Sequence, residues 1–151
     1  MTYYVFIKDE KIDGKGQCKR LDEGVLNIEV EEEIYNEIEK YIYSEGELVL
    51  NPNYEQEQGE KEAERIAKLY LTGADVERGI YQAKGMDFDD IVAMVSELQP
   101  KGLDVKALKI ELKANHFYRG NPYVDAIGGL LGLSKVQLDK FFEAGDYRYL
   151  C

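Results

Sequence analysis

Residues 25–43, VLNIEVEEEIYNEIEKYIY, contain two hydrophobic periods in succession and decide the fold class. Over residues 25–30 apolar side chains recur at every second position, as at Leu26 and Ile28, and this alternation predicts a β-strand. Beyond that strand apolar side chains recur at steps of three and four, which predicts an amphipathic helix over residues 31–43. Strands and helices in separate parts of one chain indicate an α+β fold.

The residues on either side of this stretch supply the other strands of a small sheet. Tyr3–Ile7 is apolar and rich in β-forming residues, and the turn residues Asp13–Gly16 separate it from a predicted return strand at Gln17–Leu21. After the predicted helix, a turn at Ser44–Gly46 leads to a short strand at Leu48–Leu50. The N-terminal part is therefore predicted to be a small antiparallel sheet packed on one helix.

The rest of the chain carries start and stop signals that predict a bundle of short helices. Helix starts are marked at Asn51-Pro52, Thr72, Asp87, Asn121-Pro122 and Ser134, and glycine stops at Gly85, Gly102 and Gly145. Residues 105–112 fit a helix or a strand, and their length favours a helix. We predict three segments: a sheet-and-helix unit over residues 1–51, an acidic connecting helix over residues 52–71 and an all-helical unit over residues 72–151.

The most specific local pattern predicts a tight corner between two helices. Gly128 is small enough to let two helices cross closely, and Gly132 can take the left-handed turn conformation that a Cβ would strain. Ser134 then starts the next helix, which carries the apolar Leu138. This is the steric outline of a helix–turn–helix.

The second helix of this corner lacks the basic stripe that DNA-reading helices carry. It offers Lys135, Gln137 and Lys140, but Asp139 and Glu143 offset its two cations. A net charge of −11 adds repulsion from phosphate groups, which disfavours direct binding of nucleic acid. We therefore interpret the pattern as a structural corner and rank a DNA-binding regulator third among the functions.

The acidity is concentrated in the N-terminal part of the chain. Residues 1–64 contain 7 Lys or Arg and 18 Asp or Glu, whereas residues 101–151 contain 8 and 6. A field of this sign attracts basic proteins, including proteins that themselves hold nucleic acid. An acidic surface also keeps any protein in solution, and net charge does not separate the two interpretations.

The residues that catalysis or metal binding would need are sparse. His116 is the only histidine, and it stands beside Phe117 and Tyr118, where a packed or capping role is the more common one. The aspartates within residues 87–90 lack the glycine and the distal glutamate of a calcium-binding loop. We predict a protein that is not an enzyme and has no catalytic residue, no metal site and no cofactor.

The cysteines and the hydropathy predict the cellular setting. Cys18 and Cys151 are the only cysteines and lie far apart in the sequence, which fits neither a disulfide framework nor a metal cluster. The chain has no run of about 18 apolar residues, and its N-terminus lacks the basic start of a secretory signal. We expect a reducing, intracellular compartment and no membrane contact.

The predicted helix over residues 31–43 is the candidate partner-binding element. Its exposed carboxylates would face a basic surface of another protein: Glu31, Glu32, Glu33, Glu37 and Glu39. For any one of these residues, an ordinary solvated helix face is the simpler interpretation. The scattered cations of the C-terminal part could also meet the acidic part of a second copy, which would give a homodimer.

Four stretches resemble short proteins encoded by phages and prophages of anaerobic bacteria. They are HFYRGNPYVDAIG at residues 116–128, LDKFFEAGDY at residues 138–147, YYVF at residues 3–6 and IAKLYLTGADV at residues 66–76. The resemblance thus extends over most of the chain. Its motifs are architectural, so it carries over no binding residue.

This resemblance implies two functions ahead of the DNA-binding regulator. Small acidic phage proteins include stoichiometric inhibitors of host defence nucleases, such as anti-CRISPR proteins, and this is the first interpretation. A tail-module accessory or assembly protein, which works with other virion proteins, is the alternative. Both would act by binding another protein in the cytoplasm of a bacterial host cell.

Overall fold

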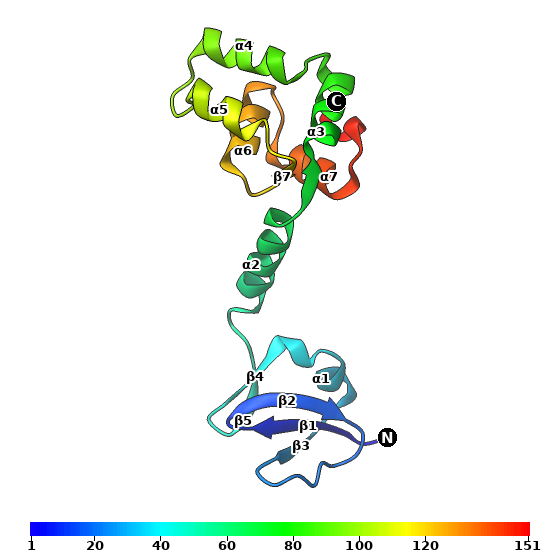
Figure 1. Ribbon diagram of the computed structural model, residues 1–151. Helices are drawn as coiled ribbons and strands as arrows, with labels where there is room; N and C mark the ends of the chain where they lie inside the picture. Colours follow the sequence, from blue (N-terminus) through cyan, green and yellow to red (C-terminus); the bar gives the residue numbers. More distant parts are fainter. The chain divides into compact units, whose positions relative to one another are not determined.

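The computed structural model describes residues 1–151 and confirms the α+β fold class. It contains an N-terminal antiparallel sheet of three strands, two further two-stranded pairs and seven α-helices (Figure 1). The chain divides into two compact units, Met1–Gly59 and Glu60–Cys151. Helix α2 (Tyr54–Ala67) begins in the first unit and ends in the second. None of the helices combines the length and the apolar character needed to cross a membrane.

The N-terminal sheet has β1 at its centre. Its strands are β1 (Tyr3–Lys8), β2 (Lys11–Gly16) and β3 (Leu26–Val30), in the order β2–β1–β3 and antiparallel throughout. Only β1 supplies fully buried apolar side chains in this unit, at positions 5 to 7, and their alternation places them on both faces of the sheet. The third strand was predicted correctly from the alternation over residues 25–30.

The predicted return strand at Gln17–Leu21 is wrong. The strand that pairs with β1 is β2, which begins at Lys11, with only two residues between it and the end of β1. Asp9 and Glu10 both have positive φ, 50° and 59°, and form the two-residue hairpin turn instead. The glycine at position 16, which indicated a turn, is a strand residue. A Cβ there would lie 3.0 Å from the Phe6 ring, so glycine serves close packing at this position.

The predicted helix over residues 31–43 is also wrong in its length. The structure has a five-residue helix α1 (Glu32–Asn36), a single 3₁₀ turn η1 (Ile38–Lys40) and then a strand, β4 (Tyr41–Ser44). The β4 strand pairs with β5 (Glu47–Leu50) through a turn in which both central residues, 45 and 46, have positive φ. A turn of this type connects two antiparallel strands, so the residues before it are strand and the predicted helix ends earlier.

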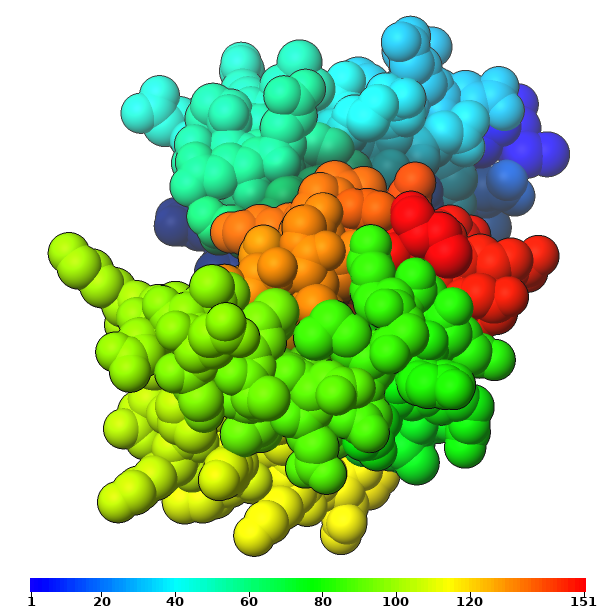
Figure 2. All heavy atoms as spheres, turned by 90° about the horizontal axis from the view of Figure 1, so that it is seen from above, coloured from blue at the N-terminus to red at the C-terminus, as the bar shows by residue number.

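The C-terminal unit is a bundle of short helices around one apolar core. Its helices are α3 (Gly73–Lys84), α4 (Phe88–Leu98), α5 (Val105–Glu111), α6 (Pro122–Leu130), α7 (Lys135–Ala144) and the 3₁₀ turn η2 (Tyr147–Leu150). Ile91, Val95 and Leu108 are completely buried. The C-terminal residues, red in Figure 2, pack against α3, drawn in green. The helix alternative for residues 105–112 is confirmed.

Most helix ends of this unit lie where the sequence predicts them. Side chains of Thr72, Asp87, Asn121 and Ser134 accept hydrogen bonds from backbone N–H groups two or three residues ahead. The glycines at positions 85 and 145 take left-handed conformations just beyond the ends of α3 and α7.

A short β-ribbon inside this unit was not predicted. The strand β6 (Tyr70–Thr72) pairs with β7 (His116–Tyr118), and helix α2 accordingly ends at Ala67 rather than at residue 71. Each strand has three residues, and its partner lies far away in the sequence, so no local period indicates either one. The ribbon buries Phe117 in the helical core and leaves its other face exposed.

The structure confirms the predicted close crossing of α6 and α7 and the tight turn between them. Gly128 is buried against Leu138, because a Cβ on Gly128 would lie 2.6 Å from Leu138 Cδ1. Gly132 has φ +74° in the turn between the helices. The neighbouring Gly129 has no atom within 4 Å of its Cβ position. Two adjacent glycines of one helix therefore have different roles.

This difference predicts opposite effects of the same substitution. We expect Gly128→Ala to lower the free energy of unfolding by about 1–3 kcal/mol, because the added methyl group overpacks a filled site. We expect Gly129→Ala to raise it by up to about 1 kcal/mol, because alanine is the better helix former. Urea unfolding of the two variants measures both changes, and equal changes would contradict the close crossing of α6 and α7.

Candidate protein-binding surface

Three consecutive glutamates stand at the start of α1 on the surface of the N-terminal unit. Glu31 precedes the helix with an extended backbone and makes no side-chain capping bond. Glu32 accepts a hydrogen bond of 2.9 Å from the hydroxyl of Tyr3, and this bond raises the pKa of Tyr3 above its ordinary value. The Glu33 side chain is exposed and makes no hydrogen bond or ion pair. The three carboxylates thus remain in solvent with little internal neutralisation.

The other two glutamates of the predicted acidic strip lie apart from these three. Glu37 follows the end of α1 and pairs with Lys40 at 2.7 Å, a contact that raises the pKa of Lys40. Glu39 lies in η1 and is exposed. Because α1 ends at Asn36, the five residues do not share one helix face, and the structure groups only Glu31 to Glu33.

An open groove of about 520 Å³ lies beside the first two of these glutamates. Four elements line it: the chain start with β1, then β3, α1 and β5. Its apolar side chains are those of Met1, Ile28, Val30, Ile34 and Leu48, and its carboxylates are those of Glu29, Glu31 and Glu32. No lysine or arginine lines it. The groove thus combines apolar side chains with three carboxylates.

The sequence did not indicate the groove because its lining comes from four separate segments. Ile28 and Leu48 were predicted only as residues of two separate strands. The open edge of β3 brings these side chains to the surface beside α1. The one usable signal was Glu29, the single charged residue of this strand.

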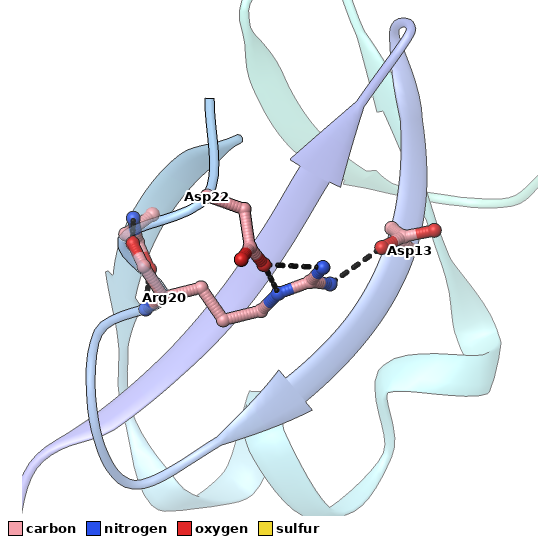
Figure 3. A network of polar contacts seen from close by, with 4 residues as sticks. Asp13, Arg20 and Asp22 are labelled. Atoms are coloured by element: carbon pink, nitrogen blue, oxygen red, sulfur yellow. Dashed lines mark hydrogen bonds and ion pairs between the residues drawn. The ribbon is translucent and has the colours of Figure 1, made fainter. Parts of the chain in front are cut away.

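The only arginine of the N-terminal unit is held inside that unit by two aspartates. Figure 3 shows Arg20 between Asp13 of β2 and Asp22 of the following loop, with nitrogen–oxygen distances of 2.5 and 2.7 Å. The hydrogen bond to Asp13, followed by that to Asp22, raises the pKa of Arg20 above its ordinary value. Asn27 of β3 also binds the backbone of Arg20 through both its amide atoms. The positive charge of Arg20 is therefore neutralised locally.

Three of the five lysines of this unit also contact a group within it, although only Lys40 pairs with a carboxylate. Lys15 donates to the carbonyl oxygen of Tyr35 at 2.5 Å, Lys19 lies 5.6 Å from the Tyr4 ring centre, and Lys40 pairs with Glu37. Residues 1–59 contain 6 Lys or Arg against 15 Asp or Glu, whereas residues 60–151 contain 13 against 15. The acidic field thus belongs to the N-terminal unit, which contains the groove.

The residues weighed for catalysis, metal binding and DNA reading have structural contacts. His116 is exposed and lies edge-on to Tyr70, with 5.3 Å between ring centres. Asp87 and Asp90 form a reciprocal capping box at the start of α4. Gln137 is used in the capping box of α7, so the second helix of the corner presents few free polar side chains. No group of three or more His, Cys, Asp or Glu side chains is placed to hold a metal ion.

Comparison with protein-family models, with curated proteins and with solved structures gives no match to this chain.

Proposed function

We propose that this chain is a non-enzymatic protein-binding protein whose N-terminal unit docks on a basic surface of another protein. The observation that carries the proposal is the groove beside α1, whose lining holds three carboxylates and no lysine or arginine. Fifteen acidic residues against six basic ones in this unit would steer a positively charged partner toward it.

The proposed partner is a host defence nuclease that the chain inhibits by stoichiometric binding. A nuclease channel is lined by lysine and arginine because it must hold phosphate groups. An acidic protein surface competes for those cations, and the bound protein then excludes the nucleic acid. The resemblance to phage-encoded proteins supports a defence nuclease of the bacterial host, with the host cytoplasm as the place of action.

Charge reversal at the three glutamates tests this proposal. Replacing Glu31, Glu32 and Glu33 by lysine is expected to weaken partner binding by about 100-fold, because three attractive contacts become repulsive. The assay is target-DNA cleavage by purified CRISPR effector nucleases with equimolar chain, measured at low and at physiological salt. The native chain should block cleavage, and raising the salt should relieve the block.

A matched control carries the same change of net charge elsewhere. Glu23, Glu55 and Glu97 are exposed and lie outside the groove, and their side chains make no hydrogen bond or ion pair. Replacing these three by lysine should leave inhibition intact. Equal inhibition by both variants would remove the role of α1, and no inhibition by the native chain would favour the tail-module alternative.

A further inference from the structure

The two edge strands of the N-terminal sheet differ in how they are protected against pairing with another strand. The β2 strand carries Lys11, Asp13 and Lys15 among its six residues, and its register with β1 is interrupted by a bulge. Charges and bulges are common protections of sheet edges. The β3 strand has Glu29 as its only charge and pairs with β1 in an unbroken register. It is thus the unprotected edge.

The groove reaches this edge and also extends to Met1–Tyr3 at the start of β1. Ile28, Glu29 and Val30 are consecutive strand residues whose side chains point alternately to the two faces, and all three line the groove. The last three residues of β3 therefore border the groove. The backbone stays extended through Glu31, with φ −68° and ψ 156°.

The backbone along this edge lacks a partner within the chain. The β3 strand has β1 as its single neighbour. None of the backbone hydrogen bonds outside the β-ladders and helices involves residues 28–30. In a strand with one neighbour, alternate residues direct their N–H and C=O groups away from it. A row of free donors and acceptors therefore faces the groove.

The charges around the edge select what can pair with it. A second copy of β3 would bring its own Glu29 against that of the first, and like charges on paired strands are destabilising. A strand with lysine or arginine opposite Glu29 and Glu31 would instead form favourable cross-strand pairs, with Glu32 close by at the start of α1. Apolar side chains of the same strand would contact Ile28 and Val30.

We propose that an extended, basic segment of the partner protein adds to β3 as a further strand of the N-terminal sheet. Main-chain hydrogen bonds along β3 hold the segment, and its alternating basic and apolar side chains fit the groove. This inference rests on the proposed function, since it names the mode in which the N-terminal unit takes its partner.

The probe for this inference is a short synthetic peptide of alternating lysine and valine. Titration into the full-length, ¹⁵N-labelled chain should shift the amide resonances of residues 28–32 and slow amide exchange within residues 28–30. A peptide of alternating glutamate and valine should bind at least tenfold more weakly. Absence of binding by the lysine peptide, or shifts confined to other residues, would overturn the inference.

Two N-methylated versions of the lysine peptide separate strand addition from charge attraction alone. One carries methyl groups on the odd-numbered amides and the other on the even-numbered amides, with unchanged charge. Only one set of amides can face β3, so one version should lose at least tenfold in affinity and the other should bind like the parent. Equal binding by both versions would exclude strand addition.

Variants of the chain give the residue-level control. Glu29→Lys should weaken binding of the lysine peptide about fivefold, and Glu23→Lys, outside the groove, should not change it. The two proposals fail separately. If charge reversal at Glu31 to Glu33 abolishes inhibition, the acidic docking surface is supported. If both N-methylated peptides then bind equally, only the added strand is excluded.

Discussion

Replacing Phe141 by alanine is expected to lower the free energy of unfolding of the C-terminal unit by about 3–5 kcal/mol. The Phe141 ring is 2% exposed and packs edge-to-face on Phe142, with ring centres 5.7 Å apart. It also fills the space beside Gly79, where a Cβ would lie 2.6 Å from the ring. Removing the ring leaves a cavity between α3 and α7 that rigid helices close only in part.

Urea unfolding followed by far-ultraviolet circular dichroism measures this change, since five of the seven helices lie in the C-terminal unit. Tyr81→Ala is the control on α3, because Tyr81 is 62% exposed and its loss should change stability by less than about 0.5 kcal/mol. Gly79→Ala should be harmful in the native chain and much less harmful beside Phe141→Ala. Additive effects of these two substitutions would contradict the packing of α3 on α7.

Replacing Arg119 by methionine is expected to lower the free energy of unfolding of the C-terminal unit by about 1.5–3 kcal/mol, the range for losing hydrogen bonds to charged groups. Arg119 follows β7 and is 6% exposed. Its Nε atom lies 2.6 Å from Asp139 of α7, and another guanidinium nitrogen lies 2.9 Å from Asp125 of α6. The Asp125 contact is an ion pair without hydrogen-bond geometry. Methionine keeps the apolar stem and leaves both carboxylates without a cation.

The control for Arg119 is Arg148, an exposed arginine that also pairs with an aspartate. Arg148 pairs with Asp146 and lowers the pKa of that carboxyl to about 2, but 78% of the Arg148 side chain is exposed. Arg148→Met should therefore produce no measurable loss of stability. The same urea titration compares the two variants, and indistinguishable midpoints would show that Arg119 does not join β7 to the α6–α7 corner.

Features set by neighbouring residues could be predicted from the sequence. A cap depends on a side chain and a backbone N–H group two or three residues ahead, so Asp87 and Ser134 identified the starts of α4 and α7. The corner at Gly128 followed from the same kind of local pattern, because a glycine between apolar helix positions indicates close contact.

Features set by distant pairing could not be predicted in this way. The apolar spacing of residues 31–43 fits a helix, but pairing with residues 47–50 converts its last three residues, 41–43, to strand. Three-residue strands such as β6 have no period of their own, and their pairing with β7 depends on the folded core.

The candidate surface was predicted only in part for the same reason. Glu31 to Glu33 are exposed together, as expected, whereas Glu37 and Glu39 lie beyond the end of α1. The groove and its carboxylate at Glu29 depend on which strand lies at the sheet edge, and alternation within a strand does not reveal that position.

Affinity purification from lysates of phage-infected or lysogenic bacteria tests the central claim most directly. Three tagged baits are compared by quantitative mass spectrometry: the native chain, the lysine variant at Glu31 to Glu33, and the lysine variant at Glu23, Glu55 and Glu97. We predict that the native and control baits retain the same basic, nucleic-acid-binding nuclease and that the Glu31 to Glu33 variant loses it. Retention of the same partners in equal amounts by all three baits would contradict an acidic docking surface on the N-terminal unit.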